Sequence, residues 1–318
     1  MLLSIICRGS SIQARCYSTK ATRTVPTLQD ASLETFRQLA FEPAVPALLP
    51  QGCQAHIPAV TKWFKQSGSK GKGKSNVTRL DTQYLSVFGS VSVPLEITNN
   101  GDFARIQNSL GFFLEFVATS ESTYILPSHP YLANRSSTTN VTGPPDSPSS
   151  AHTIPTATIY IAQASLTDLP TAMRADLPTP ELVLKAGKGD VYDSSIWLGQ
   201  APTYTPLHRD RNPNLFVQLA GRKVVRLYEP RAGNAVFSKV QEAIGGSASA
   251  TMRGEEMMQG KEKELLEKEV WSGGEGTIGG AWQAELEAGD ALFIPKGWWH
   301  SVKGLGEEIN GSVNWWFR

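Results

Sequence analysis

The stretch Thr205-Pro206-Leu207-His208-Arg209-Asp210 decides the fold of this chain. Its β-forming residues predict a strand, and the side chains of a strand alternate between its two faces. His208 and Asp210, two positions apart, are therefore expected on the same face. An imidazole and a carboxylate placed side by side can share a metal ion. The strand and its pair of polar side chains together indicate a β-rich fold around a metal site.

A second histidine lies further along, in Ile294-Pro295-Lys296-Gly297-Trp298-Trp299-His300. Gly289-Asp290 predicts a tight turn, Ala291–Ile294 a strand and Pro295 its end, so His300 would follow just beyond the strand. Either motif alone is weak evidence, because an HxD triplet is common by chance and a histidine beside two tryptophans can be a core residue. Together they supply two histidines and one carboxylate, the ligand set of non-haem Fe(II) oxygenases.

Short strands separated by turn signals dominate the second half of the chain, residues 154–318. We expect them at Thr156–Gln163, Ser194–Gly199, Tyr204–His208, Leu215–Leu219, Lys223–Tyr228, Trp282–Glu287, Ala291–Ile294 and Ile309–Phe317. Helices are expected at 169–175 and 232–244, and an exposed, charged helix at 254–271 inside an insertion near 232–280. This pattern predicts a mainly β sandwich or barrel. The open end of such a fold gives a concave interior in which residues of distant strands meet.

The preceding residues, 30–153, are expected to pack on this β domain as a lead-in. The predicted elements are a helix at Ser32–Phe41 capped by Ser32, an edge strand at Ala44–Leu49, a helical turn at Pro58–Phe64 that carries Trp63 inward, one or two strands within Tyr84–Ile97, and a helix at Asp102–Val117. Asn134–Ser150 is rich in Ser, Thr and Pro, which predicts a disordered loop.

The composition argues against a strong electrostatic preference. The 318 residues carry a net charge of +1, so no overall field attracts nucleic acid or an anionic membrane. Lys70, Lys72 and Lys74 in a Gly-rich segment leave a local anionic partner open; nucleic acid is possible but not indicated. No run of about 18 apolar residues occurs, so no membrane span is predicted. The three cysteines form no CxxC pair, which is compatible with a reducing compartment.

Residues 1–29 contain four basic residues and no acidic one. This acid-poor composition resembles a mitochondrial presequence, and Arg15-Cys16-Tyr17-Ser18 resembles a matrix-processing site with cleavage near Tyr17 or Ser18. The alternative is a secretory signal built on Leu2–Cys7, but its apolar core is too short and Arg8 follows at once. We therefore expect 1–29 to be a transit peptide and the protein to lie in the mitochondrial matrix.

Two blocks of the sequence resemble the JmjC/cupin-like 2-oxoglutarate oxygenases. The first consists of Thr205–Asp210 with Asn214, Gln218, Gly221 and Lys223, and the second of Gly289-Asp290, Ile294-Pro295, Trp298–His300 and Val313–Trp316. The chain is similar in particular to the small JmjC protein hydroxylases related to the asparaginyl hydroxylase that inhibits hypoxia-inducible factor. The specific match covers Thr156–Arg318. It implies a double-stranded β-helix, or jelly roll, for 154–318, with flanking N-terminal helices and a helical insertion.

The resemblance also implies the roles of individual residues. Fe(II) would be held by His208, Asp210 and His300, with 2-oxoglutarate and O2 as cosubstrates. Lys223 would pair with the distal carboxylate of 2-oxoglutarate, which suits a cation at the mouth of a barrel; the alternative is a surface lysine at a strand end. Thr205 and Tyr160 would donate hydroxyl hydrogen bonds to the same cosubstrate. Asn214 and Asn314 would lie near the cosubstrate and the iron and orient their ligands, whereas Trp316 is expected in the core.

The implied reaction is decarboxylation of 2-oxoglutarate to succinate coupled to hydroxylation of a protein side chain. The alternatives are a hydroxylase of tRNA or of a small molecule, and a non-catalytic metal-binding cupin scaffold. Histone demethylation is less favoured, because no chromatin-reading module is present and the targeting segment disagrees. Ala162 stands where the asparaginyl hydroxylase has a substrate-binding glutamine, so asparagine hydroxylation is not assumed. Arg209 should point away from the metal, toward substrate at the rim or into solvent.

Overall fold

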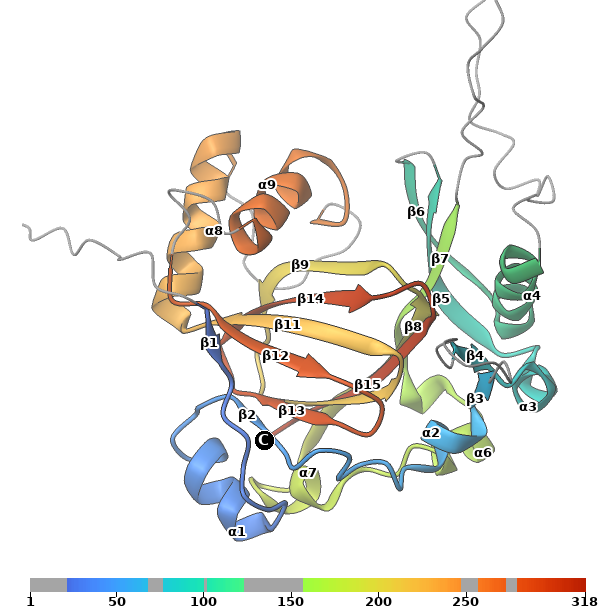
Figure 1. Ribbon diagram of the computed structural model, residues 1–318, viewed down its shortest axis with the longest axis horizontal. Coiled ribbons are helices and arrows are strands. Elements are labelled where there is room, and N and C mark those ends of the chain that lie inside the picture. Colours follow the sequence, from blue (N-terminus) through green and yellow to red (C-terminus); the bar gives the residue numbers. More distant parts are fainter. Residues whose placement is uncertain (1–21, 68–76, 100–101, 123–156, 247–256, 273–278) are drawn as a thin grey trace, which may run out of the picture.

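Two β-sheets face each other around a shared interior (Figure 1). The computed structural model describes residues 22–67, 77–99, 102–122, 157–246, 257–272 and 279–318. Along the second half of the chain, most consecutive strands pass from one sheet to the other, which is the arrangement of a jelly roll. The mainly β jelly roll expected from the sequence is therefore confirmed.

The first sheet, sheet A, has five strands in the order β1 (Arg23–Thr24), β12 (Trp282–Leu286), β11 (Arg222–Tyr228), β14 (Trp299–Leu305) and β9 (Thr203–Arg209). The second, sheet B, has eight, in the order β2 (Ala47–Leu48), β13 (Ala291–Ile294), β10 (Asn214–Ala220), β15 (Ile309–Phe317), β8 (Val191–Gln200), β7 (Thr158–Ser165), β5 (Ser92–Asn99) and β6 (Asp102–Ser109). A separate hairpin joins β3 (Phe64–Ser67) to β4 (Val77–Leu80).

Short helices lie around sheet B, and two longer ones lie over sheet A (Figure 1). The short helices are α1 (Leu33–Phe36), the π-helical turn η1 (Arg37–Phe41), α2 (Pro58–Lys62), α3 (Thr82–Leu85), α6 (Thr171–Ala175) and α7 (Glu181–Lys185); α4 (Leu110–Ser122) is longer and flanks β5 and β7. The pair over sheet A is α8 (Pro230–Ile244) and α9 (Gly260–Trp271). None of the described helices is long and apolar enough to cross a membrane.

Strands β10 and β13 of sheet B are buried on both faces, and this explains their continuous apolar sequences. All seven residues of β10 and all four of β13 are buried. On the outer face, Phe293 meets Phe36 of α1 edge to face at 5.0 Å, and Phe317 stacks on Phe41 at 5.7 Å. Ser32 caps α1 as expected, because its hydroxyl accepts the Thr35 N–H.

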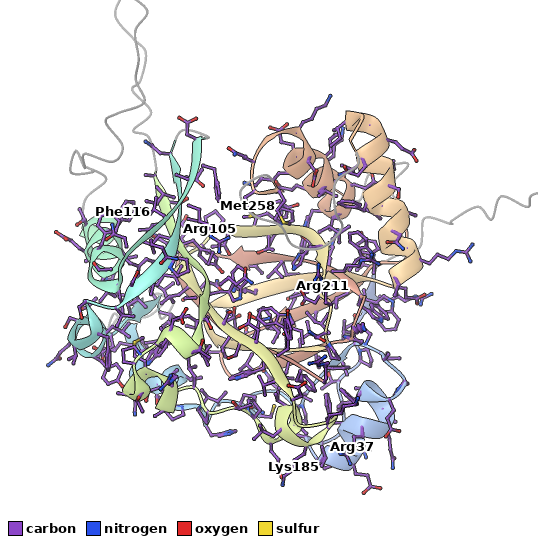
Figure 2. All side chains as sticks on the ribbon, turned by 180° about the vertical axis from the view of Figure 1, so that it is seen from behind. Arg37, Arg105, Phe116, Lys185, Arg211 and Met258 are labelled. Carbon is purple, nitrogen blue, oxygen red and sulfur yellow. The ribbon has the colours of Figure 1, made fainter. Side chains whose placement is uncertain are left out.

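Arg37 fixes the N-terminal helices to α7. Its guanidinium donates to the carbonyls of Lys185 and Ala186, the latter at 3.0 Å. Figure 2 shows Arg37 and Lys185 together at one end of the molecule. This contact joins segments that are nearly 150 residues apart in the chain, which places the lead-in firmly on the jelly roll.

A buried aspartate joins the lead-in to the jelly roll at a second place. Asp176 is 1 % exposed and accepts hydrogen bonds from Lys62 Nζ at 2.6 Å, from Trp63 Nε1 at 2.9 Å and from the Tyr84 hydroxyl. Burial alone would raise the pKa of Asp176, but these three donors outweigh it and the pKa is lowered. Trp63 lies inward, as the sequence indicated.

The helical insertion covers the outer face of sheet A. Leu207 and Trp299 are buried in one cluster with Val236 and Phe237 of α8 and Leu266 of α9. Gly233 allows this contact, because a Cβ there would lie 2.2 Å from the Trp299 ring. Of the exposed helix expected at 254–271, the described part is α9 at Gly260–Trp271, and it is only partly exposed because Leu266 and Val270 are buried.

Cationic side chains complete the contact between α9 and sheet A. Arg226 lies 4.8 Å from the centre of the Trp271 ring, and Lys303 lies 5.1 Å from the same ring. Lys303 also pairs with Glu267 at 2.6 Å. Trp271 donates through its indole N–H to Ser301 Oγ at 3.0 Å. The insertion is therefore fixed by both apolar and polar contacts.

Two predictions for the lead-in were wrong in part. Residues 82–88 are helical, so Tyr84–Ile97 contains one strand only, β5. The predicted helix at Asp102–Val117 is a strand, β6, up to Ser109 and a helix after it. Pairing of β6 with β5 along its whole length overrides the helical spacing of its apolar residues. Both strands belong to sheet B, so the lead-in also extends the jelly-roll sheet.

Several elements were absent from the sequence prediction. These are β1, the β3–β4 hairpin, α3, α7 and β14. Val25 and Leu28 are buried, so residues 25–28 belong to the fold and a cleaved leader would have to end before β1. The expected cleavage site near Tyr17 and the Asn134–Ser150 loop lie outside the described residues.

Candidate metal centre

Three potential metal ligands converge at one end of the space between the sheets. His208 and His300 face each other directly across β9 and β14, with ring centres 4.2 Å apart. Asp210 follows β9, and its carboxylate oxygens lie 3.9 Å from His208 Nε2 and 3.6 Å from His300 Nε2. All three ligand atoms lie within 4.8 Å of one another. The same-face arrangement of His208 and Asp210 expected from the HxD spacing is therefore what the chain adopts.

The backbone sets which nitrogen of each histidine is free. His208 Nδ1 lies 2.9 Å from the Pro206 carbonyl and His300 Nδ1 lies 3.3 Å from the Trp298 carbonyl. A carbonyl can only accept, so in both rings Nδ1 carries a proton and Nε2 is the nitrogen that faces Asp210. Burial, with the neighbouring His208, lowers the pKa of His300 well below its usual value. A metal ion would bind both rings through Nε2 in its unprotonated form.

Asp210 is oriented by side chains of sheet B. Its Oδ2 accepts from Trp316 Nε1 at 2.7 Å and from Asn214 Nδ2 at 3.0 Å. Asn314 in turn donates from Nδ2 to Asn214 Oδ1 at 3.0 Å. Trp316 was expected to be a plain core residue, but it is half-buried and lines the pocket.

Lys223 extends into the same interior from β11. It is 2 % exposed, and its Nζ donates to Ser312 Oγ at 2.7 Å and lies 3.4 Å from the Tyr160 hydroxyl. Burial lowers the pKa of Lys223 to about 7. Within the described part of the chain, no carboxylate lies within ion-pair distance of it. The lysine is not a surface residue, and its environment lacks the anion that would stabilise its charge.

All eight site residues predicted from the sequence line one pocket. They are Tyr160, Thr205, His208, Asp210, Asn214, Lys223, His300 and Asn314. The sequence did not identify four further lining residues, namely Trp197, Phe216, Val302 and Ser312. Strand alternation could have indicated two of them, because Phe216 and Ser312 lie two positions from Asn214 and Asn314. Arg209 points away from the centre as expected, and its guanidinium lies 5.5 Å from the outer Trp299 ring.

Tyr160 depends on a glycine in the neighbouring strand. A Cβ at Gly199 of β8 would lie 2.4 Å from the Tyr160 ring, so only glycine lets the ring lie against this strand. Burial raises the pKa of the Tyr160 hydroxyl far above its usual value, which keeps it protonated. Tyr160 can therefore donate a hydrogen bond to an anion next to Lys223.

A groove of about 190 Å³ leads away from the metal pocket. Tyr160, Trp197 and Thr205 line both spaces, so the groove and the metal pocket lie next to each other. One wall comes from β5 and β7 and the other from Met258 and Lys263 of the insertion. Figure 2 shows Met258 over the barrel, between the insertion and the strand that carries Arg105.

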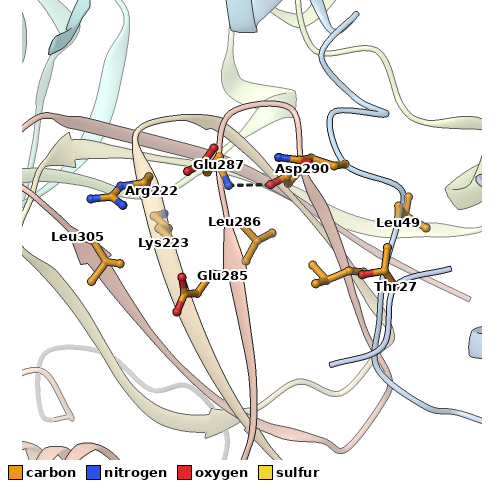
Figure 3. Close-up of a pocket in the computed structure, with 11 residues that line it drawn as sticks. Thr27, Leu49, Arg222, Lys223, Glu285, Leu286, Glu287, Asp290 and Leu305 are labelled. Atoms are coloured by element: carbon orange, nitrogen blue, oxygen red, sulfur yellow. Dashed lines mark hydrogen bonds between the residues drawn. The ribbon is translucent and has the colours of Figure 1, made fainter. Parts of the chain in front are cut away.

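A larger cavity, of about 290 Å³, lies on another side of Lys223 (Figure 3). Its polar wall includes Glu285, Glu287 and Asp290, and Asp290 accepts the Glu287 N–H at 2.8 Å. None of the three candidate metal ligands lines it, and the Lys223 ammonium is bonded to groups of the metal pocket instead. The size of this cavity therefore does not make it the reactive site.

Comparison with known proteins gives a matching family and several similar proteins. The chain matches the cupin-like domain family over residues 33–318. It is 25% identical to "Lysine-specific demethylase JMJ30" of Arabidopsis thaliana over 289 residues, which cover 90% of this chain and 53% of that protein. It is 25% identical to "Jumonji C domain-containing protein 5" of Drosophila melanogaster over 297 residues, covering 92% and 60%. "Lysine-specific demethylase 8" of Danio rerio is 27% identical over 160 residues, covering 50% and 36%. The chain spans about half the length of the curated relatives it matches.

Proposed function

The chain belongs to the cupin-like JmjC family of 2-oxoglutarate-dependent oxygenases, and on that premise we propose that it is an Fe(II)-dependent dioxygenase acting on a protein side chain. One observation carries the proposal: the convergent Nε2 and carboxylate atoms of His208, Asp210 and His300 lie in one pocket with a buried lysine that has no carboxylate partner among the described residues. The first set suits Fe(II) and the second suits a dicarboxylate.

The donor set fits both groups. Two neutral imidazoles and one carboxylate match the ligands of non-haem Fe(II) and leave coordination positions open. Lys223 would bind the distal carboxylate of 2-oxoglutarate, with the hydroxyls of Tyr160 and Ser312 beside it. When bound, iron and 2-oxoglutarate supply the oxidising power for inserting one oxygen atom of O2 into a C–H bond.

The role of the chain is to bind, orient and exclude water. Thr205 and Lys223 come from sheet A, whereas Tyr160 and Ser312 come from sheet B, so a dicarboxylate would bridge the two sheets. Phe216, Val302 and Trp197 give the pocket apolar walls. Such walls strengthen the ionic contact to Lys223 and keep water from the reacting atoms.

A protein substrate is supported by the groove that adjoins the pocket. Its aromatic and methionine side chains, with Glu96 and Lys263, offer both apolar and charged contacts to a polypeptide. Two of the similar proteins are named lysine-specific demethylases, so we propose demethylation on equal terms with stable hydroxylation. Both outcomes begin with hydroxylation of a C–H bond; on an N-methyl group the product loses formaldehyde, whereas on another carbon the hydroxyl remains.

Succinate formation tests the oxygenase proposal. Purified protein with Fe(II), ascorbate and 2-oxoglutarate should produce succinate without added substrate, and His208→Ala and Asp210→Ala should abolish it. Arg209→Ala, between the two ligands but directed toward Trp299, is the matched control. A wild-type protein that neither turns over nor binds 2-oxoglutarate would overturn the proposal and favour a non-catalytic scaffold.

Mass spectrometry of substrates distinguishes the products. Peptides and tRNA from treated cell extract are compared between wild type and His208→Ala. A gain of one oxygen atom on a peptide indicates hydroxylation, and loss of a methyl group indicates demethylation. Oxygen found only on RNA would contradict the protein substrate while leaving the oxygenase chemistry intact.

A mitochondrial location is the accompanying proposal. It rests on the acid-poor composition of residues 1–29. Because Val25 and Leu28 are buried in the fold, the test uses residues 1–22 fused to a fluorescent reporter. Import of the reporter into the matrix is expected, and a cytosolic reporter would contradict it.

A further inference from the structure

We propose that Trp316 is a positioning residue whose indole N–H fixes the orientation of the Asp210 carboxylate for metal binding. The Trp316 Nε1 to Asp210 Oδ2 distance of 2.7 Å is short for an N–H donor, as expected when the acceptor is charged. The inference rests on the proposed function, because it presumes a metal ion at His208, Asp210 and His300.

Asp210 needs this support more than the two histidines do. His208 and His300 lie within β9 and β14, and the backbone carbonyls of Pro206 and Trp298 fix their rings. Asp210 lies beyond the end of β9, where the ladder to β14 has stopped. Its side-chain orientation therefore depends on groups from outside its own sheet.

Sheet B supplies those groups as one cross-strand pair. Asn214 of β10 and Trp316 of β15 are directly opposite in the ladder, and both donate to the same oxygen, Oδ2. The two donors thus hold Asp210 from a rigid surface that is buried on both faces. The sequence distance between them is more than one hundred residues, which explains why no local motif indicates the pair.

The chemistry of a carboxylate fixes the direction of the whole hydrogen-bond chain. Ionised Asp210 can only accept, so Asn214 must turn its NH2 group toward it. The Asn214 carbonyl oxygen is then left to accept from the NH2 group of Asn314, at 3.0 Å. Neither amide can flip without placing two acceptors or two donors together, so the order from Asn314 to Asp210 has one polarity.

This arrangement separates the two oxygens of Asp210. Oδ2 receives both donors, whereas no described residue donates a hydrogen bond to Oδ1. Oδ1 is thus the oxygen without a described protein donor, and it would be free to bind a metal ion together with His208 and His300.

The neighbouring tryptophan shows that packing is not the explanation. Trp315 is fully buried in the core and its Nε1 has no hydrogen-bond partner in the described structure. Trp316 is half-buried, lines the pocket and makes the bond to Asp210. Trp316 therefore contributes a hydrogen-bond donor to the site, whereas Trp315 fills space in the core.

Titration of the metal-free full chain with Co(II) tests the proposal without a turnover assay. We compare wild type, Trp316→Phe and the matched control Trp315→Phe, which removes an indole that does not line the pocket and whose Nε1 has no described partner. Trp316→Phe should weaken Co(II) binding about 10-fold or more and change the visible absorption of the Co(II) form. Trp315→Phe should match the wild type in both, and thermal unfolding shows whether all three are folded.

The outcomes separate this inference from the proposed function. Unchanged Co(II) affinity and spectrum in Trp316→Phe would overturn the inference alone, and so would an equal loss in Trp315→Phe. A wild-type chain that binds no Co(II) would overturn the proposed metal centre as well. If Trp316→Phe does not fold, Asn214→Ala removes the other donor to Oδ2 and should produce the same weakening and spectral change; an unchanged Asn214→Ala would then overturn the inference.

Discussion

Asp176 and Lys223 are both buried charges, but their surroundings differ in kind. Asp176 is 1 % exposed and receives three donors, one of them the Lys62 ammonium. Lys223 is 2 % exposed, and its described partners are two hydroxyls and the Phe216 ring. Burial shifts the pKa of Lys223 to about 7, whereas hydrogen bonds hold the pKa of Asp176 below its usual value.

The difference distinguishes a structural charge from a binding charge. A buried ion that already has its counter-ion stabilises the segments that it joins. A buried cation without one costs free energy, and a chain that keeps it gains only when an anion arrives. The environment of Lys223 therefore indicates that it binds a ligand. Asp176 serves as the comparison, because it already has its counter-ion within the protein.

The largest expected effect is on stability, from Asp176→Ala. Its removal would leave Trp63 Nε1 and the Tyr84 hydroxyl without their acceptor, at about 1–3 kcal/mol for each donor, and should lower the free energy of unfolding by about 3–5 kcal/mol in total. Denaturant unfolding measures this. Asp190→Ala is the matched control, because its pair with Arg318 is half-exposed and should contribute less than about 1 kcal/mol. Equal losses of stability in the two variants would show that the buried aspartate contributes no more to stability than the exposed one.

Lys223→Met should weaken ligand binding without lowering stability, the opposite of Asp176→Ala. Loss of the ammonium should weaken 2-oxoglutarate binding roughly 100-fold, about 3 kcal/mol, because the distal carboxylate would be buried without a cation. The free energy of unfolding should stay equal or rise, since methionine leaves no charge in the pocket. Calorimetric titration and denaturant unfolding of the same preparation give both values. A destabilisation as large as that of Asp176→Ala would show that Lys223 is structural.

The third prediction concerns pH. Because the pKa of Lys223 is about 7, the free protein loses this charge as the pH rises through that value, and 2-oxoglutarate binding should weaken up to about tenfold per pH unit above it. The fold itself should not weaken: between about pH 7 and the usual lysine pKa of about 10.4, the unfolded chain holds more protons, so stability rises with pH. Binding is measured from about pH 6.5 to about pH 8.5, and Lys223→Met should lack the Lys223-dependent slope. Equal slopes in the two proteins would contradict the assignment.

The smallest effect is expected from Tyr160→Phe. This change removes one hydroxyl beside Lys223 and leaves the charge, so cosubstrate affinity should fall about fivefold, close to 1 kcal/mol. The fold should be unaffected, because the phenyl ring keeps its place against Gly199. A loss as large as that of Lys223→Met would mean that the hydroxyl, rather than the ammonium, dominates anion binding.

The sequence predicted the centre of the site better than its periphery. His208, Asp210 and His300 were accessible because the HxD spacing and strand alternation are local rules. The Trp316–Asp210 bond and the Asp176 donors join residues about one hundred positions apart, and only the folded chain brings them together. No local pattern encodes such pairs.

The errors in secondary structure have a similar cause. Phe103, Ile106 and Leu110 have helical spacing, yet the first two lie in β6, because β5 supplies a partner for every residue from Asp102 to Ser109. The predicted strand end at Pro295 is correct, but the sequence predicts no strand after the turn at Pro295–Gly297, where Trp299–Leu305 forms β14 between β11 and β9. Long-range pairing decided both cases.

The contact of the insertion with Leu207 and Trp299 limits how this protein can be modified. These two residues immediately precede His208 and His300 and face the opposite way, into α8 and α9. The same insertion supplies Met258 and Lys263 to the groove wall. Exchanging the insertion to alter substrate choice would therefore also disturb the strands behind both histidines. The choice of substrate and the binding of metal therefore cannot be changed independently by exchanging the insertion. A variant with altered substrate choice should carry single changes at Met258 or Lys263 and keep both helices.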